Sequence, residues 1–327
     1  MANEHIGRLE SIGIGKETVH GTAVTPTFWI PKISGSMTPV VEKARDTGAY
    51  GVIDELRATD TVKKMTETSF SAIVRDDWFG LILLAAFGQV NSAVVSGSVK
   101  DHTFTVKQDN DHPSFTINGK DPVSQEQAPY SLLDELEVDA VTGDFVKITA
   151  KFKGKTLAST SGLSVAFTAG NDFLSKHCTV RIAPTAAVVS AAAAVDVTRL
   201  KFTINKNVTD YQAFGNADVA SLFNQQWTVK GEFEMLYNAV YYRDLFIDEG
   251  DDAKRAIEFK MVNTDVTIGG SYNPSCTFTF YLVGLTSWQR SNENNALVKQ
   301  TVGFEAEYSV SDSKTMQAVL RNLTASY

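Results

Sequence analysis

Twice in this chain, a segment of alternating polar and apolar residues leads directly into a short segment rich in apolar residues. Residues 66–74 alternate and residues 78–87 are almost wholly apolar; residues 227–236 alternate in the same way, and an aromatic-rich segment follows at residues 237–250. Alternation with a period of two predicts a β-strand with one buried face, and the apolar run predicts a short helix packed on the core. The chain is therefore expected to contain the same strand-to-helix unit twice.

Two alignments relate the copies of this repeat. Phe70 aligns with Phe233 at the strand that precedes each helix, and Phe152 aligns with Phe304 near the end of each copy. The second pair is closer together in the sequence than the first, so the second copy is slightly shorter. The order of loop, strand, helix, further strands and closing strand recurs in both halves. An internal duplication is the prediction, with each copy the size of an ordinary domain.

Local signals set the limits of the first helix. Asp76 or Asp77 is expected to cap its start, because a carboxylate there accepts hydrogen bonds from unpaired backbone N–H groups. Gly88 is expected to end it.

A hairpin is predicted at residues 135–141 and 147–153, with a turn at Thr142 and Gly143. Its first strand carries carboxylates on its polar face and its second strand carries lysines. Cross-strand ion pairs are expected, each contributing about 0.2–1 kcal/mol when exposed. Further strands are expected at residues 103–107, 114–118, 256–261, 276–283 and 302–310. The predicted fold class is mainly β, with two tandem similar sandwich or partial-barrel domains, each with one flanking helix.

Composition restricts the class of protein. A chain of 327 residues has room for two domains of ordinary size, and its net charge of −8 argues against a protein that grips nucleic acid by neutralising phosphates. Cys178 and Cys276 are far apart and outside any CxxC pattern, so two free thiols are favoured over a single disulfide. No signal peptide or membrane-spanning run is apparent, which predicts a soluble protein made in a cytoplasm.

Two long polar stretches, residues 35–65 and 205–226, precede the two strand-to-helix units. They have few residues that could form a core, and we expect long loops without regular structure at both places. Two interpretations remain open: a mobile surface loop, or an arm that docks on another subunit.

The sequence contains none of the catalytic, cofactor-binding or metal-binding motifs with which it was compared. The Gly15-Lys16 pair is followed by Glu17 rather than Ser or Thr, so it does not form a phosphate-binding loop. The five histidines form no metal-ligand pattern with each other or with the cysteines. No GxSxG or SxxK pattern occurs. We therefore expect no enzyme activity, no cofactor and no metal.

The chain resembles the tail tube proteins of long-tailed, non-contractile (siphovirus-type) bacteriophages. The resemblance is carried by residues 13–18 and 21–26 with the aromatic segment 28–31, and by residues 200–208 with 227–236 and the Tyr241-Tyr242 segment after them. It covers most of the chain. It implies tube domains built as a β-sandwich or partial barrel with a flanking helix, six of which form a ring around a DNA channel.

Ring stoichiometry then depends on the duplication. With two tube domains per chain, three chains complete a pseudo-hexameric ring, which is the favoured prediction; otherwise six chains are needed and the extra residues form an outer domain. The predicted organisation is an N-terminal arm and first strand at 1–34, a first tube domain at 35–160, a connector with small-residue strands at 161–196 and a second tube domain at 197–327.

Function follows from the resemblance as an expectation. Rings stack into a tube that conducts DNA from the capsid to the host cell, with the tape measure protein and the tail tip and terminator proteins as partners, no specific DNA binding and no membrane. The protein would belong to the virion tail and assemble in the host cytoplasm. The alternative is another self-assembling virion decoration or an adhesin-like β-module.

Candidate site residues fall in two groups. An acidic channel lining would let DNA slide without stopping; its candidates are Glu67, Glu232, Glu234, Glu305 and Glu307, with Glu135, Glu137 and Asp139 next. For each of these the alternative is an ordinary outward-facing strand carboxylate. Candidate inter-ring or inter-subunit loop residues are Asp46, Tyr50, Asp54, Arg57, Asp210, Tyr211, Phe214 and Asn216.

Overall fold

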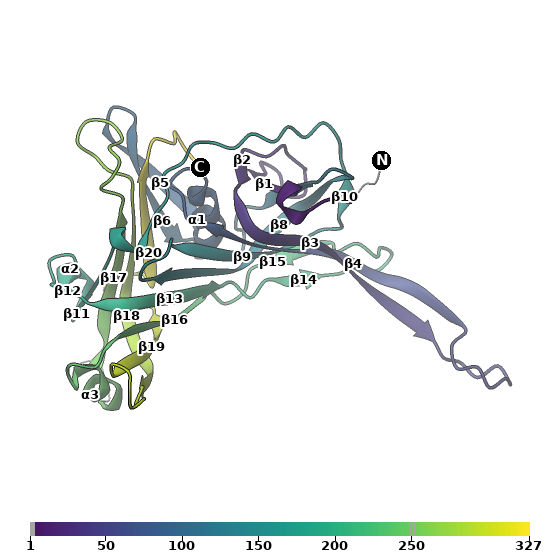
Figure 1. Cartoon of the computed structure of the whole chain (residues 1–327). Helices are drawn as coiled ribbons and strands as arrows, with labels where there is room; N and C mark the ends of the chain where they lie inside the picture. Colours follow the sequence, from purple (N-terminus) through teal and green to yellow (C-terminus); the bar gives the residue numbers. More distant parts are fainter. Residues whose placement is uncertain (1–3, 249, 251–252) are drawn as a thin grey trace.

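The computed structural model describes residues 4–248, 250 and 253–327. It is mainly β, as predicted, with antiparallel strands and short helices (Figure 1). The strands of the first half are β1 (Ser11–Lys16), β2 (Phe28–Ile30), β3 (Lys32–Asp46), β4 (Ala58–Ile73), β5 (Gly88–Ser96), β6 (Val99–Val106), β7 (Phe115–Lys120), β8 (Gln125–Val141), β9 (Lys147–Gly154) and β10 (Ala158–Ser159). Those of the second half are β11 (Cys178–Ala183), β12 (Ala194–Val195), β13 (Val197–Asn205), β14 (Thr209–Tyr211), β15 (Ser221–Phe223), β16 (Thr228–Leu236), β17 (Arg255–Val262), β18 (Ser275–Arg290), β19 (Lys299–Glu307) and β20 (Met316–Asn322).

Helices are few and short. The elements that lie wholly within the described residues are the α-helices α1 (Phe79–Phe87), α2 (Ala186–Val189) and α3 (Tyr241–Ile247) and the 3-10 turns η1 (Gly7–Leu9) and η2 (Ser175–His177). Every residue of α1 is buried, which explains why its sequence is apolar all round rather than on one stripe. α3 is shorter than the predicted segment 237–250, and Glu249 lies outside the described residues.

The ends of α1 test two predictions. Gly88 follows the helix with φ 88°, the left-handed conformation that glycine adopts readily, so the predicted stop is confirmed. The predicted acidic N-cap is wrong, because Trp78 holds that position without a side-chain bond. Asp76 instead accepts hydrogen bonds from the backbone and side chain of Asn171, and Asp77 accepts one from Thr168. These carboxylates fasten the segment before α2 to the start of α1.

One continuous antiparallel sheet runs through both halves in the order β3-β4-β9-β8-β13-β16-β19-β18. Two smaller groups of strands pair with the first residues of β8 and of β18. β2 pairs with β1, β1 with β7 and β7 with the start of β8, while β11 pairs with β17 and β17 with the start of β18. α1 and the β1–β2 pair lie on one side of the long sheet (Figure 1). The main hydrophobic core lies between this side of the sheet and those elements.

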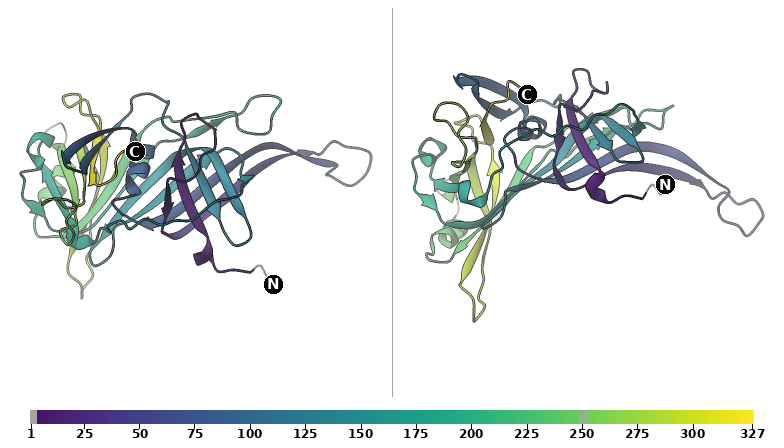
Figure 2. Two further views of the ribbon diagram at one scale, coloured as in Figure 1. Left: turned by 90° about the horizontal axis from the view of Figure 1, so that it is seen from above. Right: turned by 45° about the horizontal axis from the view of Figure 1, so that its top comes forward.

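The stretch 35–65 differs from its prediction. Residues up to Asp46 and from Ala58 onward are paired as β3 and β4, and the hairpin extends well beyond the rest of the molecule (Figures 1 and 2). The absence of a core was predicted correctly, because most side chains of this extension are exposed. The predicted absence of regular structure is wrong. The two strands of the ribbon form backbone hydrogen bonds with each other, and this pairing does not require either face to be buried.

The pairing pattern of the first half recurs in the second. Phe70 in β4 pairs with Ala150 in β9, and Phe233 in β16 pairs with Val302 in β19. The register shifts recur as well, at equivalent places in three pairs of strands. They lie at Lys32/Ser34 in β3 and Val197/Arg199 in β13, at Leu133/Glu135 in β8 and Leu285/Ser287 in β18, and at Phe115/Ile117 in β7 and Arg255/Ile257 in β17.

The ends of the two halves also correspond. β2 pairs with β1 as β12 pairs with β11, and the residues 1–34 and 161–196 therefore both contribute strands to the sheets rather than standing apart from them. In each half the short strand is followed directly by the first strand of the long sheet, β3 or β13.

Candidate assembly surfaces

All eight candidate acidic residues lie on one face of the long sheet. Residues that pair directly across antiparallel strands point to the same side. The face can therefore be followed from strand to strand through the paired residues Glu67–Lys153, Lys151–Glu135, Asp139–Lys201, Lys201–Glu232, Lys230–Glu305 and Glu234–Thr301. Glu137 and Glu307 share it because they lie two residues from Glu135 and Glu305. We call this surface the polar face; it is opposite the core side that packs against α1 and β1.

Most of these carboxylates form ion pairs. The acceptor and donor atoms lie 2.7–3.6 Å apart in the pairs Glu135–Lys151, Glu137–Lys201, Asp139–Arg199, Glu234–Lys299 and Glu305–Lys230, and Glu307 pairs with Lys254. Lys299 lowers the pKa of the Glu234 carboxyl, helped by a hydrogen bond from Thr198. The hairpin was expected to carry ion pairs between β8 and β9, and two such pairs are present, Glu135–Lys151 and Asp134–Lys153. Glu137 and Asp139 pair with β13 instead.

Glu67 and Glu232 differ from the other six, because neither forms an ion pair with another described residue. The basic side chains on the polar face are all paired: Lys147, Lys151, Lys153, Arg199, Lys201, Lys230 and Lys299 each have a carboxylate within 4 Å. The polar face thus presents neutralised cations and a small excess of carboxylate.

The tip of the β3–β4 hairpin holds the first group of candidate loop residues. Arg57 donates to the Tyr50 hydroxyl at 2.7 Å, and this hydroxyl donates to the Asp46 carboxylate at 3.1 Å. The Arg57 guanidinium also lies 4.7 Å from the centre of the Tyr50 ring. The Gly48 amide and the Tyr50 hydroxyl lower the pKa of Asp46. This network shapes the tip, while Ile53 beside it is fully exposed (104%) and Asp54 is exposed.

The second group lies on the segment between β13 and β16, which contains the small β14–β15 sheet. Asp210 forms an ion pair with Lys63 of β4 at 2.9 Å, so this segment is anchored to the base of the first hairpin. Asn216 accepts a hydrogen bond from the Asp218 amide, while Tyr211 is 57% exposed and Phe214 is fully exposed (110%). Both arms therefore end in an exposed apolar side chain.

A family model described as Phage tail tube protein matches residues 7–309. The chain belongs to this family. A comparison with curated proteins gives no match. The family is a structural one whose members assemble into the tube of the phage tail, so this chain is a structural component of the virion tail and not a member of an enzyme family.

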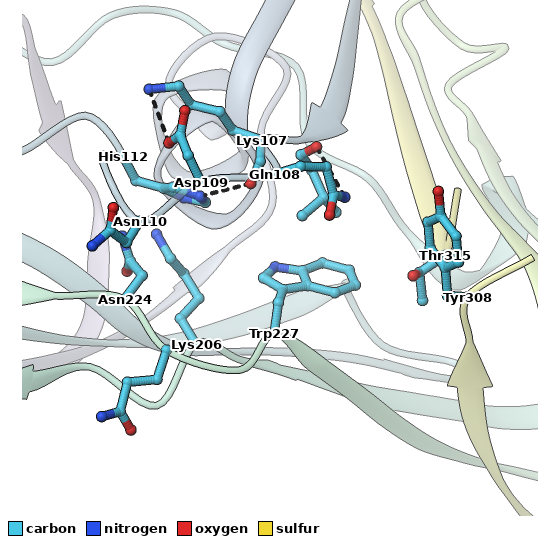
Figure 3. A pocket seen from close by; sticks show the side chains of 12 residues that line it. Lys107, Gln108, Asp109, Asn110, His112, Lys206, Asn224, Trp227, Tyr308 and Thr315 are labelled. Carbon is cyan, nitrogen blue, oxygen red and sulfur yellow. Dashed lines mark hydrogen bonds and ion pairs between the residues drawn. The ribbon is translucent and has the colours of Figure 1, made fainter. Parts of the chain in front are cut away.

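In this tail tube protein a pocket of about 430 Å³ lies where the two halves meet (Figure 3). The Lys206 side chain is buried and donates to the backbone carbonyl of Ala85 at 2.6 Å, and the Trp227 indole N–H donates to that of Ala86 at 3.1 Å. Both residues come from the second half and satisfy carbonyls in the last turn of α1. The pocket thus marks a contact that fixes α1 against β13 and β16.

Burial changes the ionisation of two side chains in this pocket. It lowers the pKa of Lys206 to about 7, opposed by the nearby Asp134 carboxylate, and lowers the pKa of His112 to about 4, assisted by the Lys206 charge. In Figure 3 the Lys206 side chain extends toward His112, whose ring bonds to the backbone carbonyl of Lys107 at 3.1 Å. Lys206 was not among the predicted site residues, because an Asn-Lys-Asn segment carries no signal of burial.

Other features of the tail tube protein concern chemistry rather than assembly. Both cysteines are free thiols, and burial raises the pKa of Cys178 to about 12 and that of Cys276 further. Within the described residues, no group of three or more His, Cys, Asp or Glu side chains is placed to hold a metal ion. None of the described helices is long and apolar enough to cross a membrane.

Proposed function

We propose that three copies of this protein close into a ring of six similar tube domains, and that the rings stack into the tube of a long, non-contractile, siphovirus-type tail through which DNA passes. The observation that carries the proposal is the recurring pairing pattern. Three register shifts at equivalent places are hard to obtain from two unrelated sheets, since a shift alters which face every later residue presents. They support two tandem domains, spanning roughly β1 to β10 and β11 to β20.

The step from one domain to the next supports a closed barrel. Strand pairing leads straight across the sheet from Phe70 through Ala150, Leu136 and Ile204 to Val229. Phe233, the counterpart of Phe70, lies four residues further along β16. An advance of four residues over four strands corresponds to a strand tilt of about 35°, from a rise of about 3.3 Å and a spacing of about 4.8 Å, which falls at the lower end of the range for closed barrels.

The polar face is the proposed channel lining. In a closed ring the core side of the sheet is expected to face outward, because the helices and additional strands packed on it need more room than the inside of the ring provides. The polar face then turns inward. Six domains of four strands give a barrel about 45 Å across between backbones on the same geometry. Phosphates passing through would meet paired cations and unpaired carboxylates, which favours sliding over binding.

The two arms are the proposed contacts between rings. Each is anchored at its base and ends in a fully exposed apolar residue, Ile53 or Phe214. Exposed apolar side chains at such tips favour burial against another subunit. The tape measure protein and the tail tip and terminator proteins would be the remaining partners, with assembly in the host cytoplasm.

Electron microscopy combined with light scattering tests the stoichiometry. Purified protein, seeded with a tail tip complex where it stays monomeric, should form rings or tubes with a central hole. One chain has a mass of 35.7 kDa, and the mass of a single ring should be three times this value. A ring mass near six times the chain mass would replace the trimer by a hexamer, and a protein that remains monomeric even when seeded would contradict the tube.

A further inference from the structure

Two strand edges of the long sheet have no partner within the described chain. β3 pairs with β4 along one edge, and no strand pairs with its other edge. β18 pairs with β19 along residues 282–290, but on the opposite edge β17 reaches only to Val283. Residues 284–290 therefore leave backbone groups open. These two edges end the eight-stranded order at opposite sides, roughly 34 Å apart across the sheet at about 4.8 Å per strand.

The chain already contains the junction that these edges would make. In the first half, β8 is the counterpart of β18, and its start pairs with β7 as the start of β18 pairs with β17. Beyond β7, residues 135–141 of β8 pair with β13, the counterpart of β3. The same place on β18 is the open edge. A second copy of the chain offers the matching strand, its own β3.

We infer that β3 of one copy adds to residues 284–290 of β18 in the next copy, in the antiparallel register that β8 and β13 use. This inference rests on the proposed ring and specifies its chain-to-chain contact. Inside the chain, Val138 pairs with Phe202 and Glu137 with Thr203. The recurring register shifts align β8 with β18 (Leu133 on Leu285) and β3 with β13 (Lys32 on Val197). In these alignments Arg290 takes the place of Val138 and Met37 that of Phe202, so Arg290 is expected opposite Met37. In the same way Gln289 and Thr38 take the places of Glu137 and Thr203, so Gln289 is expected opposite Thr38.

Backbone directions agree with this register. The amide and carbonyl of Lys64 both bond to residues 217–219, away from β3, so odd-numbered residues of β4 bond to β3. Their partners, such as Thr38 opposite Glu67, use their backbone groups on β4. Met37 and Pro39 therefore face the open edge, where the missing N–H of proline removes no bond within the chain.

The same reasoning applies to β18. The Ser291 amide bonds to the Lys299 carbonyl on β19, so Arg290 and Trp288 direct their backbone groups to the open edge. The inferred register sets Arg290 against Met37 and Trp288 against Pro39, so residues facing outward on one edge meet residues facing outward on the other. With a slip of one residue, backbone N–H and C=O groups at the open edge of one copy would face residues of the other copy whose backbone groups already bond within their own chain.

The side chains at the two junctions differ in charge. Inside the chain, Lys201 bonds to Glu137 at 2.8 Å and Arg199 to Asp139 at 3.1 Å. Between copies, the corresponding positions hold Ser34, Ser36, Gln289 and Ser291, which are neutral and exposed. The junction between copies is therefore held by backbone bonds and by burial of Met37 and Trp288, and its formation should change little with ionic strength.

Disulfide trapping tests the register. Thr38 and Gln289 would form a non-hydrogen-bonded pair with Cα atoms about 4.5 Å apart, within the range for a disulfide. The double variant Thr38→Cys/Gln289→Cys, oxidised after assembly, should give covalent dimers and trimers on a non-reducing gel and nothing larger. The single variants Thr38→Cys and Gln289→Cys should give at most a tenth of this, because the native Cys178 and Cys276 are buried or half-buried.

The variant Thr38→Cys/Ser291→Cys is the matched control, since it moves one thiol two residues along the same face. Linking of this variant instead of the first would overturn the inferred register. Rings or tubes that form without linking in either double variant would place the junction elsewhere and leave the proposed function standing. Failure of wild-type protein to form rings would instead remove the proposed function, and the inference with it.

Discussion

Lys206 is the residue that most clearly joins the two halves. Its ammonium group is buried against the last turn of α1, and burial lowers its pKa to about 7 from an unfolded value of about 10.4. Between these pH values the unfolded chain binds more protons than the folded one, so the free energy of unfolding rises with pH from about 7 to about 10. Below pH 7 the full penalty of burying the charge is present.

Replacing Lys206→Met should therefore remove part of the pH dependence of stability. The thermal midpoint of the wild type should rise by several degrees relative to the variant between pH 7 and pH 9.5, with roughly 3 kcal/mol as the upper limit of the effect. Calorimetry across this pH range measures it. Lys230→Met is the matched control, because the Lys230 side chain is 70% exposed. Equal slopes for the wild type and Lys206→Met would show that Lys206 does not lose its charge on folding.

At the scale of elements, the β3–β4 hairpin and the segment between β13 and β16 occupy equivalent places and end in exposed apolar residues. Changing Ile53→Ser or Phe214→Ser should leave the free energy of unfolding of the monomer within about 0.5 kcal/mol, because neither side chain is packed. Rings should still form, while stacking into tubes should fail or give short tubes by electron microscopy.

Val94→Ser provides the control for this prediction, since Val94 is 66% exposed on β5 and outside both arms. Tubes of normal length from both arm variants would argue that the arms do not join rings. Loss of rings as well as tubes would assign the arms to contacts within a ring.

The elements also show how far sequence reasoning reaches. Six of the eight strands of the long sheet, all but β3 and β13, and the helix α1 were predicted because alternation and apolar runs report burial directly. The β3–β4 ribbon was predicted as a loop, because a strand pair exposed on both faces leaves no hydrophobic period. Cap residues were misassigned because Asn171 and Thr168, distant in sequence, take the carboxylates of Asp76 and Asp77.

The candidate acidic residues illustrate the same limit. That Glu67, Glu137 and Glu305 share one face could be anticipated from alternation within each strand. That five of the eight have their charge balanced by a neighbouring strand could not, since it depends on which strands pair and in which register. Strand order is a property of the whole fold and is not encoded in any one segment.

For the whole molecule, the balance of charge on the polar face decides how DNA would pass. Glu67 and Glu232 are its carboxylates outside any ion pair among the described residues, one in each half. The double variant Glu67→Lys/Glu232→Lys adds two lysines to each chain. A ring of three chains would therefore carry six new cations. Assembled tubes should then retain duplex DNA, and the retention should fall steeply as salt is raised, because phosphate binding releases counterions.

Glu67→Gln with Glu232→Gln is the matched control, because it removes the same carboxylates without adding cations. Its tubes should release DNA as the wild type does, and both variants should be checked for tube formation by electron microscopy before DNA is added. Fluorescent duplex DNA that co-sediments with tubes at low salt measures the retention. If charge-reversed tubes of normal shape retain no more DNA than the glutamine control, the polar face does not line the channel, and the sheet must turn its other side inward.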